Sequence, residues 1–235
     1  MVTGDTLRMS KRVVGVVVIA LVVVGALGVV VGRQWGSVST PPTSTTSTLG
    51  PVTQPATAIW PFVSTVTRFG DPVKAAQAFA TVYLGFVNPI MGVFEQGDSR
   101  SGEVLVKETP TGPVTTIMVR QLTAANSWWV LGASCTDIVV TAPSWSERIS
   151  SPVVLQGRST AYEAVVNVDF REDGSLTPLQ SDTVMGGSMG VMRPFSKSVS
   201  FALPSTPRGA LLFRTLSAKD GHVIEASVIR VAFLK

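Results

Sequence analysis

The stretch AVVNVDFRED, residues 164–173, has the alternation of a half-buried β-strand. Its side chains divide between two faces because successive residues of a strand point to opposite sides of a sheet. The two faces consist, in chain order, of Ala164, Val166, Val168 and Phe170 on one side, and Val165, Asn167, Asp169 and Arg171 on the other. The stretch therefore predicts a strand with one face in a core, and it decides the fold class of the C-terminal part.

The residues around this strand repeat the pattern. KSVSFALP (197–204) alternates as well, with Val199, Phe201 and Leu203 on one face. Asp173-Gly174 and Asp220-Gly221 are hairpin signals between such runs. About seven short strands without a helical period predict an all-β immunoglobulin-like sandwich at residues 139–235. The chain has one cysteine, so the Cys–Trp–Cys core of antibody domains is absent.

This part of the chain resembles a known family. ISSPVVLQGRSTAYEAVVNVDFREDG (149–174) and TLSAKDGHVIEASVIRVAFL (215–234) look like the immunoglobulin-like domain of bacterial spore germination proteins, also called Gmad2. The Ser-Pro-Val…Gly opening, the Tyr162-Glu163-Ala164 step and the Ser-x-Lys-Asp-Gly turn occur in the family's order. The resemblance covers residues 139–235. It implies an extracytoplasmic sandwich appended to membrane-anchored or lipid-anchored envelope proteins, and it brings no catalytic residues.

Residues 60–138 predict a small α+β domain. DPVKAAQAFATVYLGF (71–86) has helical spacing, with Asp71 as its cap and Pro72 in its first turn. Four strand-like runs follow it, GVFEQGD, GEVLVKE, PVTTIMVRQL and SWWVLGAS. One helix followed by an antiparallel meander predicts a helix that covers one face of a sheet. We expect both Trp128 and Trp129 to pack in the core.

The apolar run VVGVVVIALVVVGALGVVVG, residues 13–32, predicts a transmembrane anchor, since about 20 helical residues span a bilayer. A cleaved signal peptide is the alternative, but its apolar region is shorter and ends at an Ala-x-Ala-like site, which is absent here. Arg8, Lys11 and Arg12 precede the run and only Arg33 follows it closely. Residues 1–12 are therefore expected in the cytoplasm, and the rest of the chain outside the cell membrane.

Residues 33–59 predict a Ser/Thr/Pro-rich stalk. Its stretch GSVSTPPTSTTSTLGPVTQPATA (36–58) carries no charge and has little apolar surface to bury. Proline keeps such a chain extended, and its composition is also permissive for O-glycosylation.

The charge of the chain argues against nucleic-acid binding. The formal net charge is +4, but four of the 19 basic residues and one of the 15 acidic residues belong to the anchor region. The exported part therefore has 15 basic and 14 acidic residues, without the clustered positive charge that a nucleic-acid surface needs.

No catalytic, cofactor or metal site is predicted. The only histidine, His222, follows Asp220-Gly221 and reads as a polar residue beside a turn. GGSMG (186–190) matches Gly-x-Ser-x-Gly around Ser188, but it lies in an all-β stretch without the strand–turn–helix context of a nucleophile elbow. Cys135 reads as a small buried hydrophobe. One histidine and one cysteine are too few for a typical zinc site.

The loop that contains Met185, Met189, Met192 and Phe195 is the candidate partner-binding site. Flexible thioethers suit an adaptable binding surface. The same side chains would equally serve to close one end of the sandwich, and the sequence leaves both readings open.

These observations predict a non-catalytic, membrane-anchored protein of a bacterial envelope. Its immunoglobulin-like domain would bind an envelope protein or a cell-wall polymer, in a setting related to sporulation or germination. Two alternatives use a cleft in the α+β domain. One is an enzyme with a site around Arg100, Glu103, Arg120 and Trp128, whose members would otherwise form cross-strand ion pairs. The other is a small-ligand carrier or sensor, which would need an apolar cavity there.

Overall fold

The structure, a computed structural model, describes residues 54–123 and 125–234, which lie within one compact unit, Leu49–Lys235. The predicted tail (1–12), anchor (13–32) and stalk as far as residue 53 lie outside the described residues. Within the described ranges, no helix is both long and apolar enough to cross a bilayer. The anchor therefore stays a prediction from the sequence.

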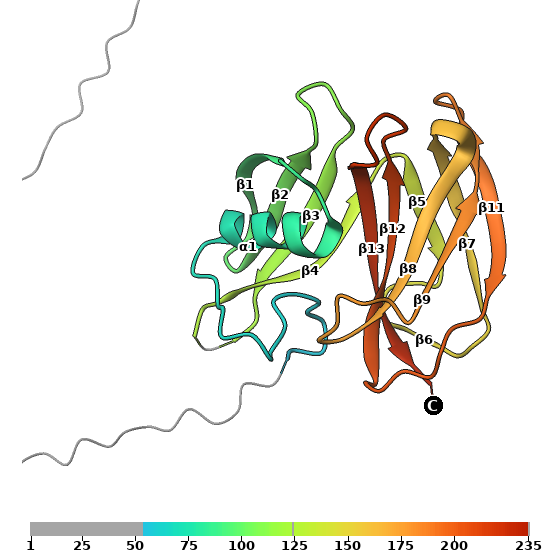
Figure 1. Cartoon of the computed structure of the whole chain (residues 1–235). Helices are drawn as coiled ribbons and strands as arrows, with labels where there is room; N and C mark the ends of the chain where they lie inside the picture. Colours follow the sequence, from blue (N-terminus) through green and yellow to red (C-terminus); the bar gives the residue numbers. More distant parts are fainter. Residues whose placement is uncertain (1–53, 124, 235) are drawn as a thin grey trace, which may run out of the picture. The chain divides into compact units, whose positions relative to one another are not determined.

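One helix and a meander form the first half of the folded chain (Figure 1). The helix α1 spans Pro72–Ala78, and a π-helical segment η1 continues it over Phe79–Leu84. The strands are β1 (Ile90–Asp98), β2 (Ser101–Lys107), β3 (Thr115–Gln121) and β4 (Trp128–Cys135). Each strand pairs antiparallel with the next, and the helix shares a core with one face of the sheet, as predicted. Asp71 caps α1 by accepting a hydrogen bond from the backbone N–H of Lys74 at 2.8 Å.

Strands dominate the second half of the described chain. They are β5 (Ile138–Ala142), β6 (Glu147–Ile149), β7 (Val153–Ala161), β8 (Val165–Glu172), β9 (Gln180–Met185), β10 (Gly187–Ser188), β11 (Arg193–Val199), β12 (Arg208–Leu216) and β13 (Val223–Phe233). A 3-10 turn, η2 (Tyr162–Ala164), separates β7 from β8. There are more strands than the sequence pattern predicts, because β6 and β10 have only three and two residues and are too short to show alternation.

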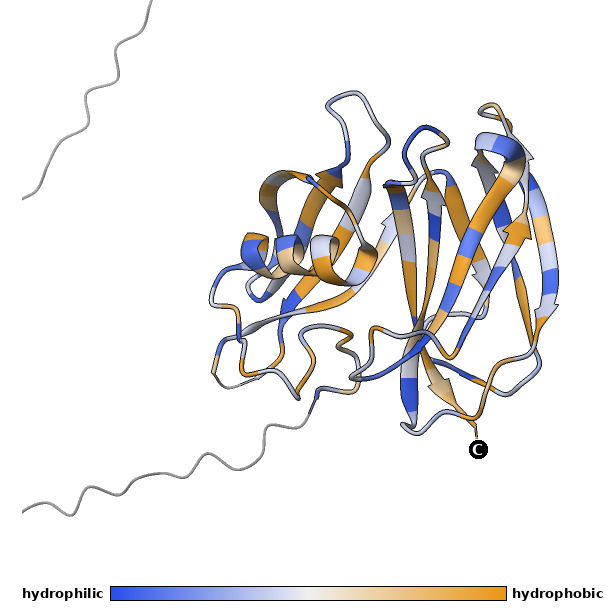
Figure 2. Cartoon of the chain, in the orientation of Figure 1, coloured by the Kyte–Doolittle hydropathy of each residue, from blue (hydrophilic) through white to orange (hydrophobic). Residues whose placement is uncertain are grey.

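The strands form two sheets. The larger sheet has the order β1-β2-β3-β4-β13-β12-β8-β9, with β6 beside β13, and the smaller has the order β10-β7-β11, with β5 beside β7. Side chains of both sheets meet in one core, which includes Leu155, Phe170 and Phe213. The fold is thus mostly β, an immunoglobulin-like sandwich with one short helix, and Figure 2 shows the alternating hydropathy that places β8 in it.

The alternation of residues 197–204 extends beyond its strand. β11 ends at Val199, and the chain then leaves the sheet. Phe201 still packs in the sandwich core, stacked on Phe170 with ring centroids 5.3 Å apart, whereas Leu203 is 78% exposed. The predicted apolar face of this stretch is therefore correct for two of its three residues, and Leu203 is the exception.

The larger sheet continues across the predicted boundary between residues 138 and 139. β4 and β13 pair antiparallel through Ala133 and Val228. β12 and β13 are covered on both faces, since Leu211 lies in the sandwich core and Leu212 packs with η1 and β4. Strands that are buried on both faces read as continuous apolar runs, as ALLF (210–213) does. The predicted domain boundary stays a prediction, but the two parts share a sheet and a core.

A buried ionic cluster lies where the helical segment meets the sandwich. Asp169 accepts hydrogen bonds at 2.9 Å from both Arg171 and Arg214, and its other oxygen accepts one from Ser181. Arg171 also donates to the backbone carbonyl of Tyr83 in η1 at 2.7 Å and lies over its ring at 5.0 Å. The polar face of β8 is therefore buried, because the helix–meander part covers it.

A second arginine ties the start of the folded chain to β13. Arg230 is 1% exposed, forms a two-point ion pair with Asp173, and donates to the backbone carbonyl of Ala56. Ala58 and Ile59 are fully buried. Residues 54–59, which the sequence pattern assigns to the stalk, thus lie on the folded part, because their apolar end packs into its core.

Replacing Asp169 with Asn should destabilise the folded chain by about 3 kcal/mol, because the buried guanidinium group of Arg171 and the half-buried one of Arg214 would lose their counter-charge. The matched control is Asp182→Asn, which breaks a more exposed pair with Lys197 and should change the free energy of unfolding by less than about 1 kcal/mol. Urea denaturation of both variants measures the difference. Equal losses would show that the Asp169 cluster contributes no more than a surface ion pair.

Candidate functional site

Three loops gather at one end of the molecule (Figure 1). They are the β2–β3 loop (108–114), the β12–β13 turn (217–222) and the segment 186–192, which lies against η2. The two Asp-Gly turns predicted from the sequence are present, with Gly174 and Gly221 at φ of 84° and 75°. This end of the sheets presents both the predicted binding loop and two neighbouring pockets.

The glycines of segment 186–192 let the loop lie tightly against β7. Gly187 and Ser188 form β10 and pair in parallel with Thr160 and Ala161. A side chain at Gly187 would overlap the backbone carbonyl of Val191. The GGSMG motif is therefore explained by close backbone approach. Ser188 sits in a two-residue strand that is followed by a turn, not by a helix.

The predicted binding loop divides between surface and core. Met185 and Met189 are 65% and 83% exposed, and Met192 is half-buried. Phe195 is 5% exposed and packs in the sandwich core beside Phe213, so its place in a partner-binding surface is corrected. The strand alternation of β11 turns Phe195 inward.

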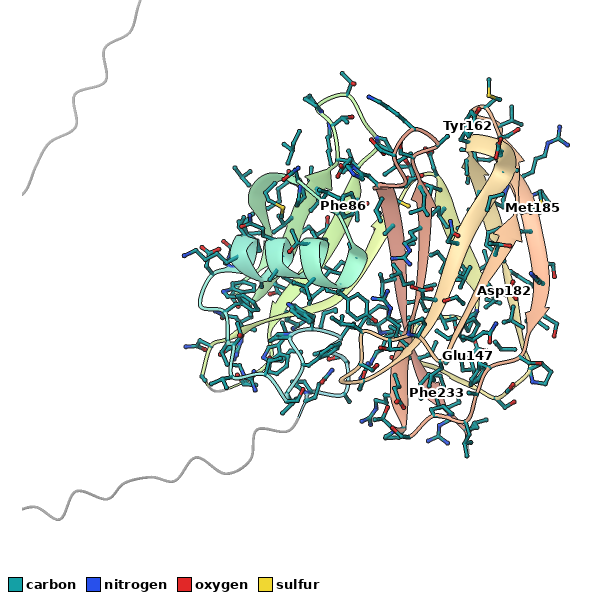
Figure 3. All side chains as sticks on the ribbon, in the orientation of Figure 1. Phe86, Glu147, Tyr162, Asp182, Met185 and Phe233 are labelled. Atoms are coloured by element: carbon teal, nitrogen blue, oxygen red, sulfur yellow. The ribbon has the colours of Figure 1, made fainter. Side chains whose placement is uncertain are left out.

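Tyr162 was missed as a surface residue by the sequence analysis. It is 61% exposed in η2, at the same end as Met185 (Figure 3). Val191 is 54% exposed in the adjacent loop. The neighbouring Glu163 and Ala164 have positive φ values of 56° and 63°, and this irregular backbone interrupts the strand pattern. The sequence signal was the Tyr162-Glu163-Ala164 step, which carried the family resemblance but no indication of exposure.

Beside these residues lies a pocket of about 240 Å³. Its lining combines carboxylates, hydroxyls and apolar groups from distant parts of the chain: Pro113, Asp137, Thr160, Ala161, Tyr162, Met189, Gly190, Thr215, Ile224 and Glu225. The pocket brings Met189 of the predicted loop to a buried carboxylate that the sequence analysis did not single out. It lies at the loop end of the sandwich and not in the predicted cleft of the α+β part.

Glu225 is the unusual group of this pocket. It is 2% exposed, and one of its oxygens lies 3.3 Å from the hydroxyl of Thr215, the residue opposite it on β12. Its second oxygen, Oε2, is buried without a well-formed hydrogen bond among the described residues, as is the hydroxyl of Thr160, although the thiol of Cys135 and the backbone of Asp137 also approach the carboxyl of Glu225. Burial, followed by the nearby charge of Asp137, raises the pKa of Glu225 to about 7. The pocket thus holds an acid that changes protonation near neutral pH.

Cys135 lies close to this acid but is not a reactive thiol. Its Sγ lies 3.3 Å from the hydroxyl of Ser227, and its side chain packs against the sandwich core. Burial, together with the charge of Glu225, raises the pKa of the Cys135 thiol far above its ordinary value. Because the thiolate is the nucleophilic form, the structure agrees with the reading of Cys135 as a small hydrophobe.

His222 lies beside the turn, as predicted. Its Nδ1 is 3.3 Å from a carboxylate oxygen of Glu108 and its backbone N–H donates to Asp220. These residues line a second pocket of about 300 Å³, which shares Pro113 and Ile224 with the first. The two pockets are therefore neighbours on one surface.

Only two of the four residues of the alternative enzyme site, Glu103 and Arg120, line a common hollow. Trp128 is buried and packs edge-on against Phe94, and Trp129 is fully buried, as expected for core residues. Arg120 pairs with Asp98 at 3.7 Å, and Arg100 donates to the carbonyl of Thr123. A hollow of about 480 Å³ on this sheet is lined by Glu103 and Arg120 among others, but not by Trp128. Within the described ranges, His, Cys, Asp and Glu form no group that would hold a metal ion.

Comparison with known proteins gives one match. Residues 137–222 match the model of the Gmad2 family, described as the immunoglobulin-like domain of bacterial spore germination. The match confirms the resemblance seen in the sequence, although it ends at His222 and leaves β13 outside. No curated protein and no solved structure matches the chain.

The raised pKa of Glu225 predicts that stability falls as the pH rises from about 4.5 to about 7. In this window the folded state keeps a proton that the unfolded chain has released, so a higher pH favours unfolding. The expected loss is at most about 3 kcal/mol. Glu225→Gln should abolish it, as measured by urea denaturation of both proteins across this pH range.

Glu147→Gln is the control. The carboxyl of Glu147 is exposed, and hydrogen bonds from Ser144 lower its pKa, so its contribution to stability changes only below the same window. A pH dependence that survives in Glu225→Gln would contradict the assignment to Glu225.

Proposed function

We propose that the chain is a non-catalytic, membrane-anchored protein of a bacterial envelope, which binds a partner outside the cell membrane through the loop end of its immunoglobulin-like part. The partner would be an envelope protein or a cell-wall polymer, in a setting related to sporulation or germination. The observation that carries the proposal is the exposed apolar patch at this end, formed by Tyr162, Met185, Met189 and Val191.

The patch has the chemistry of a recognition surface. Its four side chains are between 54% and 83% exposed, and they come from η2, the end of β9 and the 186–192 loop. Exposed apolar side chains at one end of a folded protein suit an interaction site, and methionine adapts to irregular partners. Presentation on loops above a rigid sandwich is a common arrangement for binding. The alternative reading, in which these side chains close the sandwich, fits Phe195 alone.

Placement outside the cell membrane is supported by the sequence and by the family match. The apolar run 13–32 and the basic residues before it favour an uncleaved anchor with residues 33–235 outside. The matched family is described by its part in bacterial spore germination. An anchored, exported sandwich with exposed apolar side chains at one end is suited to binding an envelope partner.

A second candidate, acid–base catalysis, is favoured by one observation. Glu225 and Asp137 line the same pocket, and Glu225 has its pKa raised to about 7. A buried carboxyl group with a raised pKa is typical of a general acid. Binding is the better-supported function, because the apolar patch beside the pocket has no part in such chemistry.

The double variant Tyr162→Ser/Met189→Ser should weaken partner binding at least about tenfold, because central aromatic and flexible apolar contacts dominate such interfaces. Leu203→Ser is the control, since Leu203 is equally exposed but lines a pocket with Ser150, Ser151 and Leu234, away from the patch. The full chain is mixed with purified sacculi and pelleted, and a photo-crosslinker at position 191 captures protein partners in the intact envelope.

Retention of wild type and control on sacculi, with loss in the double variant, would identify the polymer as the partner. A cross-linked protein without sacculus retention would identify a protein partner. Equal binding of the wild type, the double variant and the control would contradict a role for the patch.

The anchor makes its own prediction. Full-length chain should stay with the membrane fraction after an alkaline carbonate wash, and deletion of residues 13–32 should keep it in the cytoplasm. Protease added to spheroplasts should digest the folded part. A mature chain that has lost residues 1–32 and washes off the membrane would show a cleaved signal instead.

A further inference from the structure

The pocket beside the apolar patch contains two buried oxygen atoms that could accept further hydrogen bonds. Oε2 of Glu225 and the hydroxyl of Thr160 are buried, in side chains only 2% and 6% exposed, and neither atom makes a well-formed hydrogen bond among the described residues, although the thiol of Cys135 and the backbone of Asp137 also approach the Glu225 carboxyl. Both residues line the pocket. Buried polar atoms without partners are rare in native proteins, and each such atom calls for an explanation. A ligand that donates hydrogen bonds inside the pocket would supply one.

The charged residues of the pocket favour a ligand of positive charge. Glu225 and Asp137 are its two ionisable acids, and no lysine, arginine or histidine is among the residues that line it. His222 and Lys219 line the neighbouring pocket, where Glu108 and Asp220 accompany them. An anion would therefore meet only like charge, whereas a cation would meet a buried counter-ion.

The lining residues and the volume of the pocket indicate which kind of cation would fit. Ala161, Ile224 and Pro113 give an apolar side, and Tyr162 and Met189 stand at the exposed rim. An aromatic ring and a thioether at a rim favour organic cations through cation–π and dispersion contacts. The volume of about 240 Å³ is below that of usual drug-sized sites, so it fits a small head group.

We propose that this pocket binds the primary ammonium group of a small amine, with the carboxylate of Glu225 as its counter-ion and the hydroxyl of Thr160 as an acceptor. An ammonium group has three donors and no acceptor, which matches the two buried oxygens. The inference rests on the proposed function, because it names the chemistry that the same end of the sandwich recognises. The amine can sit on an alkyl chain, as in a lysine side chain, or on a sugar.

The test is calorimetric titration of the full-length chain, in mild detergent, with n-butylamine and with glucosamine. The uncharged partners of these probes are n-butanol and N-acetylglucosamine. At least one amine should bind saturably, and its uncharged partner should not. The better amine distinguishes an alkyl source from a sugar source.

Glu225→Gln should weaken the binding about 30-fold or more, because the cation would lose a desolvated partner. This variant removes a charge whose burial is unfavourable, so it is expected to fold. Thr160→Val is a second, shape-conserving variant and should weaken binding several-fold. Glu108→Gln, in the neighbouring pocket, is the matched control and should bind within about twofold of wild type.

Three results would overturn the inference: no amine binding up to about 10 mM, equal binding of the amine and its uncharged partner, or undiminished binding in Glu225→Gln. Its failure is distinguishable from that of the proposed function. If the wild-type chain binds sacculi or a cross-linked partner but no amine, the result contradicts the ammonium site and leaves the proposed function in place. Chain that binds an amine through Glu225 but retains no partner supports the site and removes the proposed function.

Discussion

The carboxylate of Asp169, held between the guanidinium groups of Arg171 and Arg214, is the interaction on which the arrangement of the folded chain depends. Two cations at the contact between η1 and the sandwich would be costly without it. Arg171, whose charge Asp169 balances, donates a hydrogen bond to the backbone carbonyl of Tyr83 and so holds the end of the helical segment against β8. On the same sheet, the backbone N–H of Ala226 donates to the hydroxyl of Thr115, next to the β2–β3 loop that contributes Pro113 to the pocket. The pocket at the loop end is therefore lined by residues from both parts of the folded chain.

Local patterns were enough to predict the elements but not how they meet. The strand at 164–173, the Asp71 cap and the two Asp-Gly turns follow from alternation, capping and turn chemistry, which act over a few residues. Burial of the polar face of β8 does not follow from such local patterns. The alternation alone places Asp169 and Arg171 in solvent, and only the folded chain brings the distant Arg214 beside them. For Phe195, the sequence left a binding surface and the sandwich core equally open, because a methionine-rich loop masked the strand that begins at Arg193.

The candidate site was harder to predict because its parts are far apart in sequence. Glu225 is a single acid in an apolar strand and belongs to no recognisable motif. It becomes a candidate only in the structure, where it lies opposite Thr215 on β12 and lines a pocket together with Thr160. The family match ends at His222, so Pro113 lies before it and Glu225 lies beyond it. The pocket thus draws on segments on both sides of the region that resembles other proteins. Its ligand is a matter for the chemistry of this chain and does not follow from the family's description.

Native-state hydrogen exchange under increasing denaturant tests most directly whether the two parts behave as one unit around Asp169. We expect the slowest amides of β2–β4 and of β7, β8 and β12 to lose protection at one common free energy, because the shared sheet and the buried cluster couple them. The amides near Pro113 and those around Glu225 should respond together. Opening of the meander at a clearly lower free energy, with the sandwich still protected, would show that Asp169 does not join the two parts into one unit.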